Sequence, residues 1–386
     1  MELIDKIIGT DEMLVNPSSS QKTKELYSYL KDVVNNNKVI IGHQNAAHMS
    51  VYKDADGGSD VKQITGSYPG LVGLDTLSLA GDEVGASSRE EALKKSIELT
   101  KKVASEGAII TVSTHMPNFT DTRFKVSEGV YDFTSANFLD CKNLGGNCVD
   151  AILDNTQATL AYNAYLDIIV EYAKGIDGLP VLFRPLHENN GKWFWWGAMN
   201  SPEKYRELFQ YTVKYIISKG VDNFIYIYSP NGPILSIEEY AERYPGDEYV
   251  DIVAFDYYDD YLVAGQGYRD DFMVKLEATC NTINAFAIAH NKMGAISEVG
   301  SRVTRENGKN DGLKLENNPM YGKNWYRLVA QVAIRTNMAY YLLWGNFSLD
   351  NFYMTFIIPG EFEHEMAKEF LDMYNDDYSI FASDIL

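Results

Sequence analysis

The chain has 386 residues, of which 45% are hydrophobic and 13% aromatic, which is enough for one large core. Its formal net charge of −20 argues against nucleic acid as a partner, because phosphates would be repelled. No run of 18 apolar residues occurs, so we expect no membrane span, and the N-terminal MELIDKIIGTDE lacks the basic and apolar regions of a signal peptide. Location stays open between secretion and the cytoplasm, because the sequence does not tell whether Met1 is the native start.

Short apolar runs alternate with segments whose apolar side chains recur at helical spacing. Ser19 or Ser20 and Ser201 are expected N-caps. Two segments, 119–154 and 301–318, show no clear period and are expected to be loops, the first long enough to suggest a functional role. The expected strands span 39–45, 71–80, 108–118, 181–188, 224–231, 251–258, 294–300 and 339–346. The expected helices span 19–36, 88–106, 155–173, 202–220, 271–290, 320–336 and 361–374.

Such alternation predicts parallel strands joined by crossover helices, and eight units predict a (β/α)8 barrel, the TIM barrel. We assign residues 1–386 to one α/β domain with an N-terminal extension over about 1–37. An open doubly wound sheet is the alternative, but it would require a glycine-rich phosphate turn after the first strand. Gly42 together with Gly57 and Gly58 does not supply that turn.

The stretch VLFRPLHENNGKWFWWG, residues 181–197, changes character within a few residues. An apolar strand leads to Arg184, His187 and Glu188, and three tryptophans follow the turn at Asn190. Aromatic rings pack on the C–H faces of a pyranose, and a carboxyl can protonate a glycosidic oxygen. A core strand with an aromatic turn is the alternative reading, but three titratable side chains in five residues suit a core poorly.

Polar and aromatic residues also gather at the C-terminal ends of other expected strands, the face on which barrel active sites lie. Among them are His43, His115, Tyr258, Glu298 and Trp344. Glu188 and Glu298 end the fourth and seventh strands, which face each other across a barrel. Retaining glycosidases use two carboxyls about 5–5.5 Å apart. Glu298 has the alternative reading of an ion-pair partner or a solvated loop residue.

The segment R-P-L-H-E-x-N-G-x-W-F-W-W-G resembles the acid/base segment of glycoside hydrolase family 26, which consists mostly of β-mannanases. Weaker matches occur in the expected order between about 39 and 346. The resemblance implies a (β/α)8 barrel with Glu188 as acid/base and Glu298 as nucleophile. It also implies that Tyr258 hydrogen-bonds the nucleophile. His187 would contact the sugar at the cleavage site, with Trp193, Trp344 and His115 lining the adjoining subsites. Arg184, Asn190 and His43 complete the expected substrate site.

Some of these residues have structural alternatives. His43 could bond only within the barrel mouth, His115 could be a satisfied strand-end histidine, and Arg184 is expected to orient the glutamates. Trp195 or Trp196 is expected to pack the barrel, which leaves Trp193 as the sugar contact. Asp75 and Asp82 are read as structural.

The expected activity is retaining hydrolysis of β-1,4-mannosidic bonds in mannan, galactomannan or glucomannan by a monomer, with no cofactor or metal. Glu188 must then be protonated and Glu298 ionised. A xylanase or mixed-linkage glucanase is the runner-up, and a carbohydrate-binding protein without turnover is the rival class. Cys141 and Cys148 share a loop and could form a disulfide or remain thiols, and with Cys280 their spacing makes no zinc site.

Overall fold

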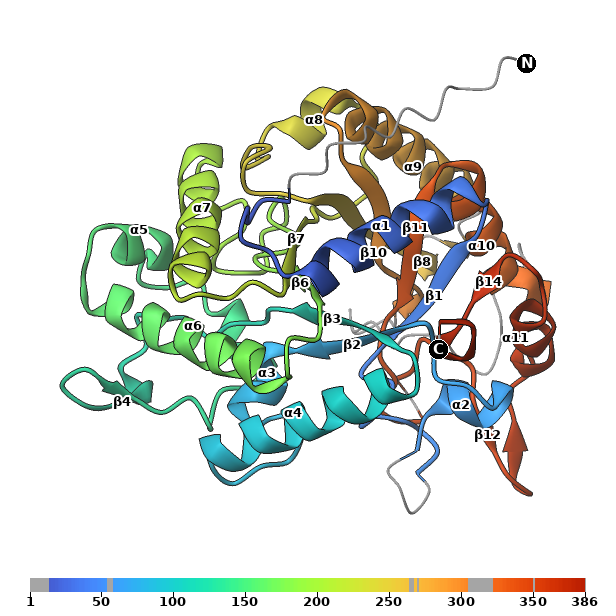
Figure 1. Cartoon of the computed structure of the whole chain (residues 1–386), viewed down its shortest axis with the longest axis horizontal. Coiled ribbons are helices and arrows are strands. Elements are labelled where there is room, and N and C mark those ends of the chain that lie inside the picture. Colours follow the sequence, from blue (N-terminus) through green and yellow to red (C-terminus); the bar gives the residue numbers. More distant parts are fainter. Residues whose placement is uncertain are drawn as a thin grey trace.

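Eight parallel strands close into a barrel in the computed structural model, as the alternation of strands and helices predicts (Figure 1). The structure describes residues 14–53, 58–263, 267–268, 271–304, 322–349 and 351–385. The first and last barrel strands pair in parallel, and the pairing of β10 with β8 completes the ring. The barrel strands are β1 (Val39–Gln44), β2 (Leu71–Asp75), β3 (Ile109–Ser113), β6 (Val181–Arg184), β7 (Phe224–Tyr228), β8 (Ile252–Val263), β10 (Met293–Thr304) and β11 (Met338–Leu343).

Helices surround the barrel and cover the outward side of its strands (Figure 1). Serine N-caps begin several of them, because the Ser20, Ser88 and Ser201 side chains accept backbone N–H groups of the first turn. The helices are α1 (Gln21–Asn35), α2 (Asp60–Thr65), α3 (Thr76–Ala80), α4 (Arg89–Ser105), α5 (Cys148–Leu153), α6 (Gln157–Gly175), α7 (Pro202–Ser218), α8 (Ile237–Ala241), α9 (Phe272–Ala289), α10 (Trp325–Arg335) and α11 (Ala367–Tyr374).

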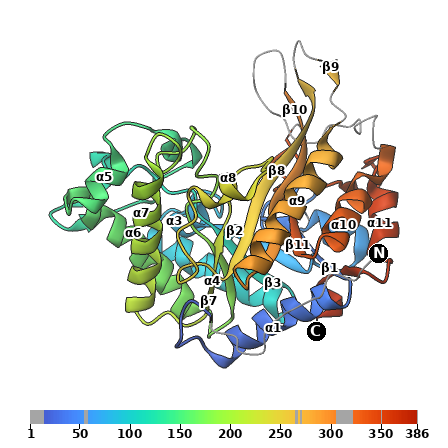
Figure 2. The same cartoon turned by 90° about the horizontal axis from the view of Figure 1, so that it is seen from above.

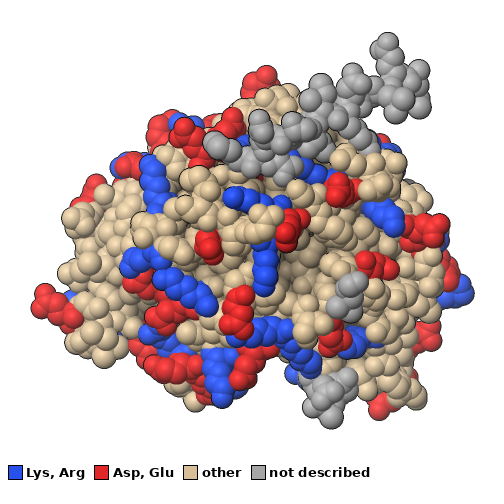
Figure 3. Space-filling view, viewed as in Figure 1, with Lys and Arg blue, Asp and Glu red and all other residues tan. Residues whose placement is uncertain are grey.

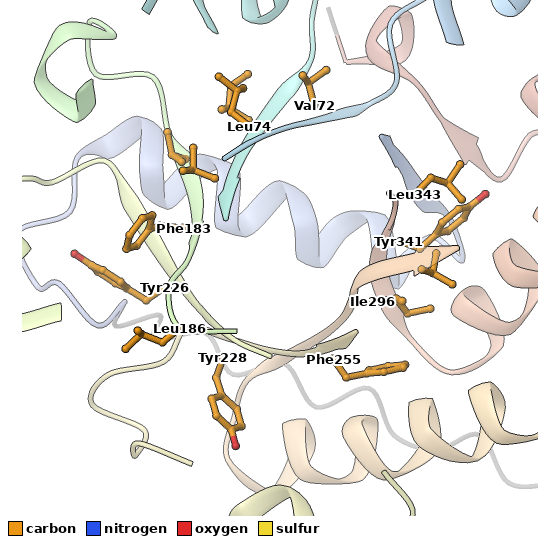
Figure 4. Close-up of a cluster of buried hydrophobic side chains, with 14 of the residues drawn as sticks. Val72, Leu74, Phe183, Leu186, Tyr226, Tyr228, Phe255, Ile296, Tyr341 and Leu343 are labelled. Atoms are coloured by element: carbon orange, nitrogen blue, oxygen red, sulfur yellow. The ribbon is translucent and has the colours of Figure 1, made fainter. Parts of the chain in front are cut away.

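Successive strand residues alternate between two buried layers, as the pleat of a β-strand requires. Phe183 and Phe255 point outward into the layer between strands and helices (Figure 4). Their neighbours Leu182 and Ala254 belong to a second cluster in the barrel interior, which also contains Leu30 of α1. The core therefore consists of a filled barrel and a surrounding shell.

The first segment of the chain closes the N-terminal end of the barrel, opposite the end at which β8 and β10 project (Figure 2). The Val15 amide donates to Asp251 at 2.7 Å, and the Tyr27 hydroxyl donates to the carbonyl of the same residue at 3.3 Å. The outer face over α1 carries basic and acidic side chains interspersed (Figure 3). The predicted extension therefore packs against the barrel over residues 14–36.

Several predicted boundaries were wrong. The strand expected over 71–80 ends at Asp75, whose carboxylate accepts the Leu77 amide at 3.0 Å and so caps α3. The strand expected over 181–188 ends at Arg184, because the chain turns there with positive φ at Leu186 and Glu188. The helix expected over 361–374 begins only at Ala367, after the short strands β12 (Ile357–Ile358) and β13 (Phe362–Glu363).

The two predicted loops also differ from expectation. The segment 119–154 contains a small hairpin, two 3₁₀ turns and α5, with aromatic side chains packed beneath it. Residues 301–304 continue β10 and pair in parallel with β8, with a register shift between Arg302 and Val303, and the remainder of the 301–318 segment lies outside the described residues. The additional elements are η1 (Thr122–Phe124), β4 (Lys125–Ser127), β5 (Val130–Tyr131), η2 (Phe138–Lys142), β9 (Gly267–Tyr268), η3 (Gly322–Asn324), β14 (Ser379–Ile380) and η4 (Ala382–Asp384).

Cys141, Cys148 and Cys280 are buried free thiols. The Cys141 thiol donates to the Phe138 carbonyl, and the Cys148 sulfur accepts the Phe119 amide. The sequence left open whether Cys141 and Cys148 form a disulfide or remain thiols, and in the structure both are thiols. Among the described residues, no helix is both long and apolar enough to cross a membrane.

Leu30→Ala should lower the free energy of unfolding by about 2–5 kcal/mol, since the side chain is fully buried against the barrel interior. Lys24→Ala, on the exposed side of α1, is the matched control and should change it by less than about 0.5 kcal/mol. Urea unfolding followed by circular dichroism measures both. Equal effects of the two substitutions would show that α1 does not support the barrel.

Candidate active site

Arg184 is a buried cation at the C-terminal end of β6, and it joins three strands. Its Nη1 donates to Asp256 of β8 at 2.8 Å, and its Nη2 donates to Glu298 of β10. The Ser297 hydroxyl donates to the other oxygen of Asp256 at 2.7 Å. Buried charges require such pairing, because an unpaired charge in the interior is costly. The end of β6 and the middle parts of β8 and β10 are thereby held at fixed positions relative to one another.

Glu298 is a buried carboxyl whose two oxygens both accept hydrogen bonds. Arg184 donates to Oε1, and the Tyr258 hydroxyl donates to Oε2 at 2.7 Å. The two donors hold the Glu298 carboxyl in one orientation at the barrel mouth.

Glu188 lies on the turn after β6, four residues beyond the strand end. Leu186 and Glu188 have φ values of +52° and +51°, in the left-handed region that non-glycine residues seldom adopt. Two hydrogen bonds support this backbone: the Leu186 amide donates to the Thr114 hydroxyl at 3.0 Å, and the Glu188 amide donates to the Ser229 carbonyl at 2.8 Å. Backbone strain of this kind is typical of functional sites.

The two carboxyls lie in different environments. Desolvation and, after it, the charge of Glu298 together raise the pKa of Glu188 to about 7, against the lowering effects of Arg302 and the Trp193 indole. The Trp193 Nε1–H donates to Glu188 Oε2 at 2.6 Å. A carboxyl with this pKa can hold a proton at neutral pH and release it, as a general acid must.

A chain of hydrogen bonds leads from Asp75 through His115 to His187. The His115 Nδ1 lies 2.8 Å from Asp75 Oδ2, and its Nε2 lies 3.2 Å from His187 Nε2. Burial would lower the pKa of His115, but the Asp75 carboxylate reverses this and the pKa is raised. Burial lowers the pKa of His187 well below its usual value, with Arg184 and His115 adding to the effect. We infer that protonated His115 donates to neutral His187, whose Nδ1–H is then left without a protein partner among the described residues.

Aromatic rings surround this histidine pair. The Trp344 ring lies 5.9 Å from the His115 ring, and the Phe138 ring lies 5.0 Å from it, measured between centroids. Trp193 is 39% exposed, whereas Trp195 and Trp196 are buried and donate to backbone carbonyls. Phe138 was not predicted as a site residue, because the only signal in the sequence was the length of the 119–154 segment that contains it. The exposed faces offer packing surfaces for sugar rings.

The family model of glycosyl hydrolase family 26 matches residues 15–344 of this chain. The chain belongs to this family. It is 31% identical to the mannan endo-1,4-β-mannosidase of Bifidobacterium adolescentis over 88% of its own length, and it spans 32% of that longer protein.

Solved structures agree with the family assignment. The catalytic domain of a family 26 endo-β-1,4-mannanase from Bacillus sp. JAMB-750 has a TM-score of 0.83 and 29% identity, with coverage of 99% of this chain and 97% of that one. A modular endo-β-1,4-mannanase of Cellulomonas fimi has a TM-score of 0.80 and 28% identity, with coverage of 97% and 79%. The (β/α)8 fold is therefore the fold of the family.

Two other residues that were predicted for the substrate site of this family 26 chain lie apart from the Glu188 and Glu298 carboxyls. Asn190 exchanges two hydrogen bonds with the Asn231 backbone, at 2.8 and 2.7 Å, and so ties the Glu188 turn to the end of β7. His43 is fully buried on β1, and burial lowers its pKa to about 3. Within the described part of the chain, neither side chain hydrogen-bonds Glu188 or Glu298. Their assignment to the substrate site stays a prediction.

One group of side chains at the mouth has the spacing of a metal site, since His187, Asp256 and Glu298 offer ligand atoms within 4.8 Å of one another. Arg184 already donates to both carboxylates. A guanidinium in this position repels a cation and occupies the lone pairs that a metal would use. The donor set of this family 26 site therefore suits an internal ion pair better than a metal.

Trp193→Phe should shift the alkaline limb of the kcat/KM profile to higher pH. The wild-type limb is expected near the Glu188 pKa of about 7. The indole N–H stabilises the ionised carboxyl, so its removal raises the pKa and keeps the donor protonated at higher pH. Phenylalanine retains an aromatic face as the internal control. A limb that stays in place or moves to lower pH would contradict the assigned hydrogen bond.

Proposed function

We propose that this chain hydrolyses β-1,4-mannosidic bonds in mannan, galactomannan or glucomannan with retention of configuration. The observation that carries the proposal is the contrast between two carboxyls at one barrel mouth. Glu188 has a raised pKa of about 7, whereas Glu298 is held by Arg184 and Tyr258. A retaining glycosidase needs one protonated and one ionised carboxyl in this arrangement.

The first step forms a glycosyl-enzyme. Glu298 attacks the anomeric carbon while Glu188 protonates the departing glycosidic oxygen, through an oxocarbenium-like transition state. The Tyr258 hydroxyl and Arg184 keep the attacking carboxylate in place. In the second step Glu188, now ionised, removes a proton from water, and the water displaces Glu298 from the sugar. Both glutamates then return to their starting protonation states.

The proposed specificity for mannose depends on one side chain, His187. Mannose differs from glucose in its axial 2-hydroxyl, on the carbon next to the one that the nucleophile attacks and on the ring face opposite to that attack. His187 has a ring nitrogen within 4.8 Å of Glu298, and its Nδ1 has no protein partner among the described residues. The Asp75–His115 pair fixes its tautomer, so His187 can donate to that hydroxyl. The relatives named as mannan endo-1,4-β-mannosidases support the same substrate.

Other parts of the proposal follow from the sequence alone. We propose action as a monomer without nucleic acid, membrane, metal or cofactor. A xylanase, a mixed-linkage glucanase and a carbohydrate-binding protein without turnover remain the rival functions that activity measurements would distinguish.

Glu188→Ala should reduce turnover of mannan by about 10²–10⁴-fold and affect activated aryl mannosides much less, because only poor leaving groups need protonation. Azide should rescue the activity of this variant, with formation of the β-mannosyl azide.

Glu298→Ala should lose activity on all glycosides, because the covalent step is lost. Thermal melting serves as the folding control. A well-folded Glu298→Ala protein with more than about a tenth of wild-type activity would exclude the nucleophile role.

The wild-type kcat/KM should be higher on β-1,4-mannan than on xylan or mixed-linkage glucan under one condition. The physical reason is the donor at His187 facing an axial hydroxyl. A preference for xylan or mixed-linkage glucan would contradict the assignment of mannan as the substrate and would not affect the proposed retaining mechanism. Absence of any turnover, with binding of mannohexaose retained, would favour the carbohydrate-binding alternative.

A further inference from the structure

We propose that Arg302 is a positioning residue of this site, which acts on Glu298 through the Tyr258 ring and on Glu188 through its charge. Arg302 lies near the C-terminal end of β10, a strand that projects with β8 at the mouth end of the barrel (Figure 2). The inference rests on the proposed glycoside hydrolysis and extends it to a side chain that the sequence did not indicate.

The pairing of β10 with β8 puts Arg302 on the same face of the strand as Glu298. Side chains two residues apart on a strand lie on one face, and no register shift interrupts the pairing between Glu298 and Arg302. The cross-strand pairs are Glu298–Asp256, Gly300–Tyr258 and Arg302–Asp260. One face of the two strands therefore leads from the nucleophile candidate to Arg302.

Gly300 leaves room on this face for the Tyr258 ring. A Cβ atom at Gly300 would lie 3.1 Å from Tyr258 Cε1 and 2.5 Å from Tyr353 Cδ1, closer than such atoms normally pack. The two tyrosine rings meet edge to face, with centroids 5.7 Å apart. Tyr258 can thus lie between Glu298 and Arg302, with its hydroxyl donating to Glu298 at 2.7 Å.

Arg302 covers one face of the Tyr258 ring. Its guanidinium carbon lies 4.1 Å from the ring centroid, in the range of a cation–π contact. Its Nε and Nη2 donate to the two oxygens of Asp260 at 3.0 and 3.2 Å, and this bidentate pair fixes the plane of the guanidinium. Asp260, Arg302, Tyr258 and Glu298 therefore form one connected series.

Arg302 also acts on Glu188, which lies on the turn after β6. Burial and, after it, the charge of Glu298 raise the pKa of Glu188, and Arg302 is the largest of the influences that lower it. Arg302 is therefore the cation that most favours ionised Glu188. The groups that interact electrostatically with Glu188 are Glu298 and Arg302 of β10, Arg184 of β6, Asp256 and Tyr258 of β8, and the Trp193 indole.

The test compares the two halves of the Arg302–Asp260 pair. Arg302→Met removes the charge and keeps an unbranched side chain, whereas Asp260→Asn keeps the cation and removes its ionic anchor. Arg335→Met is the matched control, because Arg335 also forms a bidentate pair, with Glu277 at 2.6 and 2.7 Å, between the outer helices α10 and α9. The kcat/KM of each protein on mannotetraose is measured as a function of pH.

Arg302→Met should move the alkaline limb to higher pH by about half a unit or more, because loss of a nearby cation raises the pKa of Glu188. Asp260→Asn should leave the limb in place or move it to lower pH, because the cation remains and its counter-charge is lost. Between the limbs, both variants should lower kcat/KM by at least about fivefold, because both release the Tyr258 ring. Arg335→Met should change neither quantity.

A double-mutant cycle tests the route through Tyr258. In the Tyr258→Phe background, the further loss from Arg302→Met between the limbs should be less than about twofold, because the hydroxyl that Arg302 positions is gone. The proposal is overturned by a limb that stays in place in Arg302→Met, by one that moves to higher pH in Asp260→Asn, or by a loss that Tyr258→Phe does not diminish.

If thermal melting shows that Arg302→Met does not fold, Arg302→Lys takes its place. Lysine keeps the charge and lacks the planar guanidinium, so the alkaline limb should stay in place and the loss of about fivefold between the limbs should remain. Full activity of this variant, or a limb that moves to higher pH, would overturn the proposal.

Failure of the proposed function can be distinguished from failure of the Arg302 proposal. If the wild type cleaves xylo- or gluco-oligosaccharides and not mannotetraose, the mannan assignment is wrong, and the variants are compared on the oligosaccharide that is cleaved. If no oligosaccharide is cleaved, the proposed hydrolysis is wrong. A ¹³C NMR titration of glutamate-labelled protein, with Glu188→Gln to assign the signal, then measures the pKa of Glu188 without turnover. An unchanged pKa in Arg302→Met would overturn the role of Arg302.

Discussion

The site depends on one buried guanidinium. Arg184 is 1% exposed, and it donates to Asp256 and Glu298 from neighbouring parts of the barrel. Removing an ion from water costs several kcal/mol, and two carboxylates with good geometry offset that cost. Because Asp256 stands on β8, Glu298 on β10 and Arg184 on β6, the interaction that pairs the buried charge also fixes three strands relative to one another. The nucleophile candidate is one of those partners.

This constraint separates the two glutamates chemically. Glu298 sits deep, with donors on both oxygens, while Glu188 sits on a strained turn at the mouth with one indole donor. Burial and, after it, the charge of Glu298 make Glu188 harder to ionise. The position of each glutamate in the barrel accounts for the difference in environment. The turn after β6 holds Glu188 at the barrel mouth.

Much of this arrangement could be predicted from the residues. The apolar runs gave the barrel, and the RPLHENNGKWFWWG segment drew attention to Arg184 and Glu188. Boundaries were predicted less well, since Asp75 caps a helix where an apolar run seemed to continue. Phe138 could not be singled out, because its segment has no period and its role depends on packing against His115, 23 residues earlier in the chain.

The sequence by itself determined roughly where the eight barrel strands and the longer helices occur, and which chemical groups follow the strands. Local spacing and side-chain type carry that information, because a pleated strand and a helix each have a fixed period. Only the tertiary structure decided which groups meet. The pairs Asp75–His115 and Arg184–Asp256 lie 40 and 72 residues apart, and their contacts depend on the register and closure of the barrel. Register is a property of paired strands, so no one strand specifies it.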